Sequence, residues 1–206
     1  MTDSPTDPKS ALTEAAARLF AEHGYGAVSI DRITAEVGAT KGLFYHHFSA
    51  KGDILADIVV GLRTRTLAAA ATALDRLAPD ARPEARLEAL ALAELNCAAA
   101  EPAAARVAAW ADPILATARM ADERRIARDL AVEARQSLER LYQNVYRDGV
   151  RAGRLEPLPP RFAVWLIRLP IVAATDWAAG PDGARTPADR VAEAVARFAS
   201  RGLLES

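Results

Sequence analysis

The sequence predicts an all-α fold of about nine helices, divided into a small N-terminal part and a larger C-terminal part. Of its 206 residues, 51% are hydrophobic and many of these are alanine, whereas runs of β-branched and aromatic residues are few. This composition favours helices over strands. Between clusters of proline and glycine, apolar residues recur at intervals of three and four, the period of an amphipathic helix. The length is sufficient for two unequal domains.

We expect three parts along the chain. Residues 1–8 hold two prolines and three small polar residues, and are predicted to be a disordered arm. Residues 9–52, which we call the head, carry the sequence features of a compact three-helix domain. Residues 53–206, the body, form a larger helical domain.

The first helix of the head is predicted to begin near Pro8 or Lys9 and to end at Gly24. Glycine readily adopts the left-handed conformation that ends many helices. The buried face is formed by apolar residues spaced at i, i+4, i+7 and i+8, namely Leu12, Ala16, Leu19 and Phe20. Tyr25 is expected to fold back as a core aromatic.

Two short helices follow, in an arrangement typical of a helix-turn-helix. Ser29 can cap the first of them through its hydroxyl, and Gly38 is expected to end it. Thr40 can cap the second. Apolar residues along both are expected to lock the pair onto the first helix: Ile30, Ile33, Val37, Phe44 and Phe48.

The body begins with a long helix that is predicted to run from Ser49 or Ala50 to about Leu77, before a linker at 78–83. Two further breaks are expected at Pro102 and Pro113. A long charged amphipathic helix should then span about 121–152, followed by an apolar helix over 162–179 and a last helix from Thr186-Pro187.

The net charge of −1 does not by itself indicate a nucleic-acid partner. The local charge does, because the only formally charged side chains among residues 38–52 are Lys41 and Lys51, accompanied by His46 and His47. A patch of +2 favours phosphates. Lys41, Gly42, Leu43, Tyr45 and His46 are expected to point outward from the second short helix.

These residues resemble the reading head of the tetracycline-repressor (TetR) family. That family carries a Gly-x-[Ser/Thr]-x-Gly-x-[Leu/Ile/Phe]-Tyr-x-[His/Tyr]-Phe-x-x-Lys pattern, which stands here as residues 38–51. The first two helices also match in order and spacing, so that the resemblance covers roughly residues 9–56. Three positions depart from the commoner residues: Val28, Thr34 and Val37.

The resemblance implies a division of roles within the head. Thr40, Tyr45, His47 and Lys51 would contact phosphates of double-stranded DNA, while Ser29 would cap the supporting helix. The residues implied to face bases or the groove wall are Lys41, Gly42 and His46, with Leu43 beside them. Adjacent histidines at 46 and 47 diverge by roughly 100° on a helix, so they do not suggest a catalytic base pair.

For the body, the resemblance implies an effector-binding and dimerisation domain. The candidate ligand-binding residues are Asn96, Trp110, Phe162 and Leu166. The alanine-rich middle suggests a hydrophobic or mixed small-molecule effector. The candidate residues of a homodimer interface lie in the last two helices: Arg168, Asp176, Trp177, Val191, Val195 and Phe198.

Two charged residues in the apolar segment leave two interpretations open. Arg168 and Asp176 are expected to be paired, either across a subunit interface or as polar anchors for a ligand. Cys97 has no flanking basic residue that would lower its pKa, so a buried small side chain is the simpler interpretation than a redox sensor.

The sequence therefore predicts a cytoplasmic, dimeric regulator that is not an enzyme. It has no convergent set of acid, base or metal ligands, and it suggests no cofactor. Met1 to Ser10 lacks the features of a secretory signal, and no apolar stretch is long enough to suggest a membrane span. The expected function is repression at a palindromic operator, relieved by a small molecule.

Overall fold

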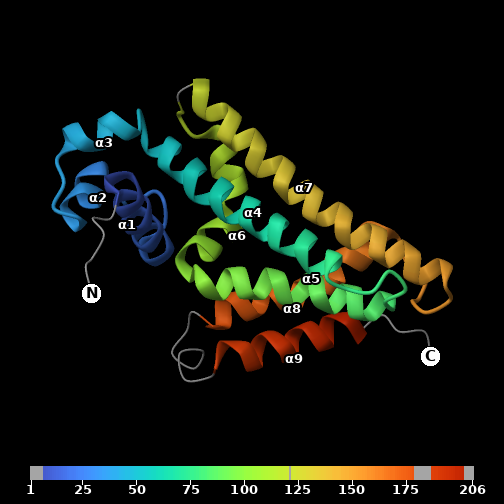
Figure 1. Cartoon of the computed structure of the whole chain (residues 1–206). Coiled ribbons are helices and arrows are strands. Elements are labelled where there is room, and N and C mark those ends of the chain that lie inside the picture. Colours follow the sequence, from blue (N-terminus) through green and yellow to red (C-terminus); the bar gives the residue numbers. More distant parts are fainter. Residues whose placement is uncertain (1–6, 121, 179–186, 202–206) are drawn as a thin grey trace. The chain divides into compact units, whose positions relative to one another are not determined.

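The computed structural model describes residues 7–120, 122–178 and 187–201, and Figure 1 shows their arrangement. Within these ranges there are nine helices and no strand, which confirms the predicted all-α fold. In chain order the helices are α1 Pro8–His23, α2 Ile30–Glu36, α3 Lys41–His47, α4 Lys51–Asp75, α5 Pro83–Ala100, α6 Pro102–Thr117, α7 Asp122–Arg151, α8 Pro160–Ala178 and α9 Ala188–Arg201. Residues 1–6 of the predicted disordered arm lie outside the described ranges.

Most helix boundaries lie within two residues of those that the sequence predicts. The predicted break at Pro113 is wrong, because Pro113 lies inside α6. A proline in a helix removes one hydrogen bond to the carbonyl four residues earlier. Here that carbonyl belongs to Ala109, which is exposed, so that water can satisfy it. Trp110 therefore lies within a continuous helix rather than at a break.

Contacts divide the chain into two compact units, which we describe separately. The first unit comprises Met1–Arg63 and Ala103–Val132, and the second comprises Thr64–Pro102 and Glu133–Ser206. The first unit thus joins the head to α6 and to the beginning of α7.

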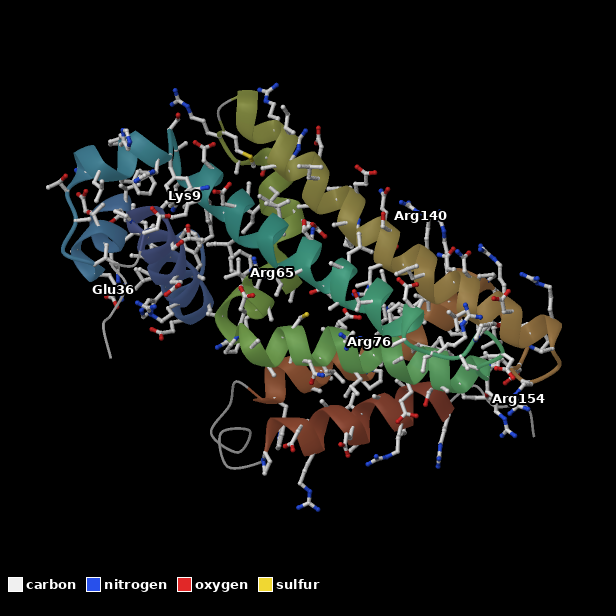
Figure 2. The ribbon with its side chains drawn as sticks, viewed as in Figure 1. Lys9, Glu36, Arg65, Arg76, Arg140 and Arg154 are labelled. Atoms are coloured by element: carbon white, nitrogen blue, oxygen red, sulfur yellow. The ribbon has the colours of Figure 1, made fainter. Side chains whose placement is uncertain are left out.

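The core of the first unit is apolar and completely buried. Its large side chains are Leu12, Phe20, Ile33, Phe44, Phe48, Ile54 and Leu55. At its edge, Lys9 of α1 forms an ion pair with Asp57 of α4 at 2.6 Å (Figure 2). This contact ties the head to the first half of α4.

A largely buried arginine holds three helices of the first unit together. Arg63 of α4 forms an ion pair with Asp112 of α6 at 2.7 Å and donates to the carbonyl oxygen of Ala108 at 3.1 Å. It also donates to the carbonyl oxygen of Ala131 in α7 at 3.4 Å. Because these acceptors come from two helices, Arg63 fixes α4 against both of them.

The beginning of α4 also makes a very close backbone approach. A side-chain carbon at Gly52 would overlap the carbonyl oxygen of Arg119 and press on Met120, both in the segment after α6. Glycine is required here for lack of space, not for an unusual backbone conformation.

The second unit is built around α5, α8 and α9, which pack side by side with part of α7 (Figure 1). Its core contains Leu87, Leu90, Tyr142, Tyr146 and Ile167, all nearly or completely buried. The Tyr146 hydroxyl lies 2.7 Å from the carbonyl oxygen of Glu156 and accepts a hydrogen bond from the Leu158 amide at 2.6 Å. The connection between α7 and α8 is thereby fixed to the core.

Two searches over the described residues gave no candidates. None of the helices there is long and apolar enough to cross a membrane. The His, Cys, Asp and Glu side chains of the same residues form no group of three or more that could hold a metal ion.

Candidate nucleic-acid interface

The two short helices of the head begin at side-chain caps that their sequences predict. The Ser29 hydroxyl accepts a hydrogen bond from the Arg32 amide at 3.1 Å, and the Thr40 hydroxyl accepts one from the Leu43 amide at 3.2 Å. Between the helices, Gly38 adopts a left-handed φ of 64°. Each cap satisfies an amide that the first turn of a helix leaves free, and the glycine allows the tight turn.

The inner face of α3 is anchored by aromatic side chains. Phe44 and Phe48 are buried, with ring centroids 5.5 Å apart, beside the buried Ile33 of α2. Tyr25 is half-buried rather than fully in the core, and its ring lies 5.3 Å from that of Phe20. This packing fixes which face of α3 is turned outward.

The outer face of α3 presents polar side chains and one glycine. Lys41, Gly42 and His46 are exposed, and the side chain of Tyr45 is 55% exposed. Leu43 and His47 are half-buried at the sides of the helix. A short helix with an exposed polar tip is the geometry by which a helix-turn-helix enters the major groove of DNA.

Gly42 is not required by the fold of the head. A side-chain carbon at this position would meet only the Thr40 hydroxyl, at an ordinary 3.5 Å. The missing side chain leaves the outer surface of α3 open at a place where an external backbone could approach closely.

Lys41 has an acidic partner on α2. Its ammonium lies 2.7 Å from Asp31, and both side chains are exposed. The hydrogen bond to Asp31 and the attraction of its charge raise the pKa of Lys41. Lys41 is therefore charged, but it must exchange Asp31 for a phosphate or a base if it binds DNA.

Lys51 is held inside the head by two backbone carbonyls. Its ammonium donates to the carbonyl oxygens of Tyr25 and Val28, each at 2.7 Å, and lies 4.2 Å from the centroid of the Tyr25 ring. Burial lowers the pKa of Lys51, and burial, followed by the nearby charge of Asp53, raises the pKa of Tyr25. Because an ammonium has three donors, one remains for a phosphate.

Three of these contacts were not evident from the sequence. Asp31 lies ten positions before Lys41, and the two carbonyls bound by Lys51 lie 23 and 26 positions before it. Asp53 is completely buried and accepts hydrogen bonds from the Ser49 and Ala50 amides, each at 2.8 Å. Only Asp53 had a local signal, since an acidic residue in the first turn of a helix often caps it.

The effector and dimer candidates of the body lie on several helices. Asn96 is exposed on α5, Trp110 is half-buried on α6, and on α8 Leu166 is half-buried while Phe162 is exposed. Trp177 on α8 and Phe198 on α9 are 44% and 69% exposed, and the half-buried pair on α9 is Val191 and Val195. The side chain of Asp176 lies outside the described residues.

Arg168 is paired within the second unit. It forms two hydrogen bonds with Glu94 of α5, at 2.5 and 3.2 Å, and lies 3.8 Å from Glu139 of α7. Burial alone would lower the pKa of Arg168, but the charge of Glu94 and its hydrogen bonds outweigh it and raise that pKa. The expectation that this charge is paired is met by α5, inside the chain.

Comparison with known proteins gives a family and a fold. Residues 12–58 match the family model described as bacterial regulatory proteins, tetR family. Over 52 residues the chain is 36% identical to the HTH-type transcriptional repressor AcnR of Corynebacterium glutamicum, covering 25% of this chain and 28% of AcnR. The sequence match thus spans little more than a quarter of that relative and is confined to the head.

Two solved structures share the whole fold. The ketosteroid transcriptional regulator KstR2 of Mycobacterium tuberculosis superimposes with a TM-score of 0.80 at 20% identity, covering 98% of each chain. The regulator FadR of Bacillus subtilis, solved with stearoyl-CoA, superimposes with a TM-score of 0.67 at 17% identity, covering 94% of this chain and 98% of FadR. At these identities the similarity concerns the fold alone.

Proposed function

Because its head places this chain in the tetR family of bacterial regulatory proteins, we propose that it is a ligand-responsive transcriptional repressor. The observation that carries this proposal is the exposed outer face of α3, with Lys41, Tyr45 and His46 projecting from a helix whose inner face is locked by buried phenylalanines. The named relative AcnR is itself a transcriptional repressor. Binding to chromosomal DNA would place the protein in the cytoplasm.

On DNA, positioning and specificity would be divided along α3. Thr40, Tyr45, His47 and the free donor of Lys51 would contact phosphates, which fix the register of the protein on the duplex. Lys41, Gly42 and His46, with Leu43, would face the base edges. Ser29 would contribute indirectly, because its cap orients α2 beneath α3.

We propose a homodimer that binds a palindromic operator. Large apolar side chains are exposed on the outer face of α8, namely Phe162, Trp165, Leu169, Val172 and Trp177, and Phe198 is exposed on α9. Exposed apolar surface of this extent commonly marks a protein interface. Packing α8 and α9 against a second copy would give a four-helix interface and present two heads to successive major grooves about 34 Å apart.

Regulation would follow from a small molecule that binds one arrangement of the dimer better than the other. A coupling of about 1–3 kcal/mol between the effector and DNA is sufficient for such a response. The effector would be hydrophobic or mixed in character, with Asn96, Trp110, Phe162 and Leu166 as candidate contacts.

A salt titration of DNA binding tests the proposal most directly. Fluorescence anisotropy with the DNA upstream of the protein's own gene should show affinity that falls steeply with salt. Lys41→Ala and Tyr45→Ala should abolish or strongly weaken specific binding without unfolding the protein. A helical protein that only binds ligands would show no salt-dependent DNA affinity, and that result would exclude the proposal.

A further inference from the structure

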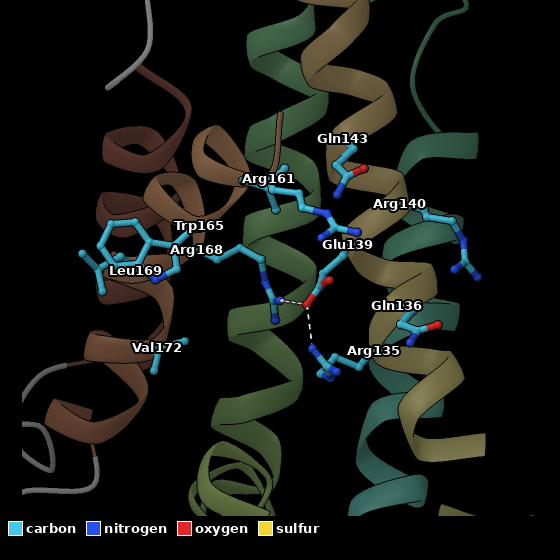
Figure 3. A pocket seen from close by; sticks show the side chains of 11 residues that line it. Arg135, Gln136, Glu139, Arg140, Gln143, Arg161, Trp165, Arg168, Leu169 and Val172 are labelled. Atoms are coloured by element: carbon cyan, nitrogen blue, oxygen red, sulfur yellow. Dashed lines mark hydrogen bonds and ion pairs between the residues drawn. The ribbon is translucent and has the colours of Figure 1, made fainter. Parts of the chain in front are cut away.

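A large groove lies between α7 and α8 of the second unit, away from the residues assigned to DNA. Its volume is about 790 Å³, within the range of small-molecule sites in proteins. Its lining residues come from these two helices alone: Arg135, Gln136, Glu139, Arg140, Gln143, Arg161, Val164, Trp165, Arg168, Leu169 and Val172. Figure 3 shows this groove from close by.

The groove is strongly basic. Four of its lining residues are arginines and only one, Glu139, is acidic. Glu139 is already engaged, since it lies 3.0 Å from Arg135 and 3.8 Å from Arg168, as the dashed lines in Figure 3 show. The single carboxylate of the lining therefore cannot neutralise the groove.

Arg161 is the arginine that is available for a ligand. It extends from the first turn of α8 toward α7 (Figure 3), and among the described residues it has no hydrogen bond or ion pair. Arg168, by contrast, is fixed at the floor by its two hydrogen bonds with Glu94. The groove thus combines a prearranged positive floor with a guanidinium whose donors are unused.

The α8 side of the groove is apolar and aromatic. The Trp165 side chain is 56% exposed, and its ring is stacked on Phe162 with centroids 5.9 Å apart. Leu169 and Val172 continue this wall, each 49% exposed. A flat ring or an aliphatic chain could cover these side chains, whereas a simple inorganic anion would leave them in water.

We propose that this groove binds a phosphate-bearing amphipathic anion, with its phosphate groups at Arg161 and its apolar or aromatic part along Trp165, Leu169 and Val172. Guanidinium groups pair with phosphate through two parallel hydrogen bonds, which gives both strength and orientation. Stacking on an exposed tryptophan would suit a nucleotide base. This inference rests on the proposed function, since it gives the effector a chemical class.

A second copy of the chain is the other possible occupant of the groove. The polar wall belongs to α7, which the proposed dimer interface on α8 and α9 does not use. An apolar partner helix would leave the Arg161 guanidinium buried without a counter-charge, which is costly. A ligand with phosphate groups supplies that counter-charge.

Binding of coenzyme A and of stearoyl-coenzyme A, below its micelle-forming concentration, tests the inference by calorimetry on the full chain. Both probes should bind saturably, and binding should weaken as salt is raised. Arg161→Gln should weaken both by about 10-fold. Arg76→Gln removes an exposed arginine of α4, outside the groove lining, and should leave both affinities unchanged.

Two further probes separate the parts of the ligand. Stearate, which lacks phosphate, and inorganic phosphate, which lacks an apolar part, should each bind at least 10-fold more weakly than stearoyl-coenzyme A. Equal affinity for either probe would overturn the inference, as would the absence of saturable coenzyme binding up to about 1 mM or an unchanged affinity of Arg161→Gln.

Light scattering and DNA anisotropy on the same samples complete the test. If Arg161→Gln and Trp165→Leu become monomeric while their coenzyme affinity is unchanged, a second copy occupies the groove and the inference is wrong. DNA binding that persists without coenzyme binding would overturn this inference alone. Coenzyme binding in a protein that never binds DNA would support the groove and overturn the repressor function.

Discussion

The ammonium of Lys51 lies over the ring of Tyr25 and donates a hydrogen bond to the carbonyl oxygen of that same residue, at 2.7 Å. A second hydrogen bond reaches Val28. Lys51 thus closes the loop between α1 and α2 from the beginning of α4. A residue that the family resemblance assigns to DNA also holds the head together, and the two roles are experimentally separable.

Replacing Lys51 with methionine should lower both stability and DNA affinity. Loss of two hydrogen bonds from a charged donor should cost about 1–3 kcal/mol and lower the melting temperature by several degrees. Loss of a phosphate contact should weaken specific and non-specific DNA alike and reduce the salt slope by about 1. A slope that stays at the wild-type value would mean that Lys51 acts only within the chain.

Replacing Asp31 with asparagine should strengthen DNA binding. The change releases Lys41 from its ion pair and removes a negative charge from the surface that meets phosphates. Exposed ion pairs of this kind are worth about 0.2–1 kcal/mol, so an affinity gain of about 2- to 5-fold is expected by anisotropy. Glu14→Gln changes the charge of the head equally on α1 and should have little effect. A similar gain in both variants would point to net charge alone.

Replacing Gly42 with alanine should separate DNA binding from folding. The site has room for the methyl group, and alanine favours a helix over glycine by roughly 0.5–1 kcal/mol. The melting temperature should therefore be unchanged or slightly higher. DNA affinity should nevertheless fall by about 10-fold or more, if the outer face of α3 approaches the groove closely. Wild-type affinity in this variant would remove Gly42 from the interface.

The stability of the body should depend on alkaline pH through Tyr142. Burial, and then the charge of Glu94, raise the pKa of the Tyr142 hydroxyl well above its ordinary value of 10.0. A group whose pKa is raised by folding stabilises the protein fully below pH 10, and this contribution is lost as the pH rises beyond it. The advantage in melting temperature of wild type over Tyr142→Phe should thus shrink between pH 8 and pH 11.

A matched control for this pH dependence is Tyr45→Phe, which alters an exposed tyrosine of the head. It should retain the alkaline loss of stability that wild type shows. An advantage over Tyr142→Phe that stays constant to pH 11 would contradict the predicted linkage.

A charge placed on the outer face of α8 should disrupt the proposed dimer. Trp177 is 44% exposed at the end of this helix, and Trp177→Arg should give monomers by light scattering. Ala68→Arg adds the same charge to an exposed position of α4 and should remain dimeric. Dimers of Trp177→Arg would move the interface to another surface.

What the sequence could predict depends on how far apart the interacting residues are. The caps at Ser29 and Thr40 involve amides three positions away, so local chemistry suffices to identify them. The pairing of Arg168 with Glu94 joins residues 74 positions apart, and only the packed helices bring them together. The sequence indicated that Arg168 would be paired, but not with which residue.

The groove between α7 and α8 illustrates the same difference. Its arginines are spread through a charged helix that, from sequence alone, is typical of a solvated surface. Arg135 and Arg161 become neighbours of one cavity only because α7 and α8 run beside each other. A cavity depends on shape, which no spacing rule describes.

The close approach at Gly52 bears on how the reading head can be used as a building block. The backbone of Arg119 fits against α4 with no room for even one methyl group. Cutting the chain after the third helix would remove α4 and the surface on which it rests, and would strip Lys9 of its partner Asp57. Grafting this DNA specificity onto another regulator therefore calls for transferring α4 and the segment around Arg119 together with the helix-turn-helix.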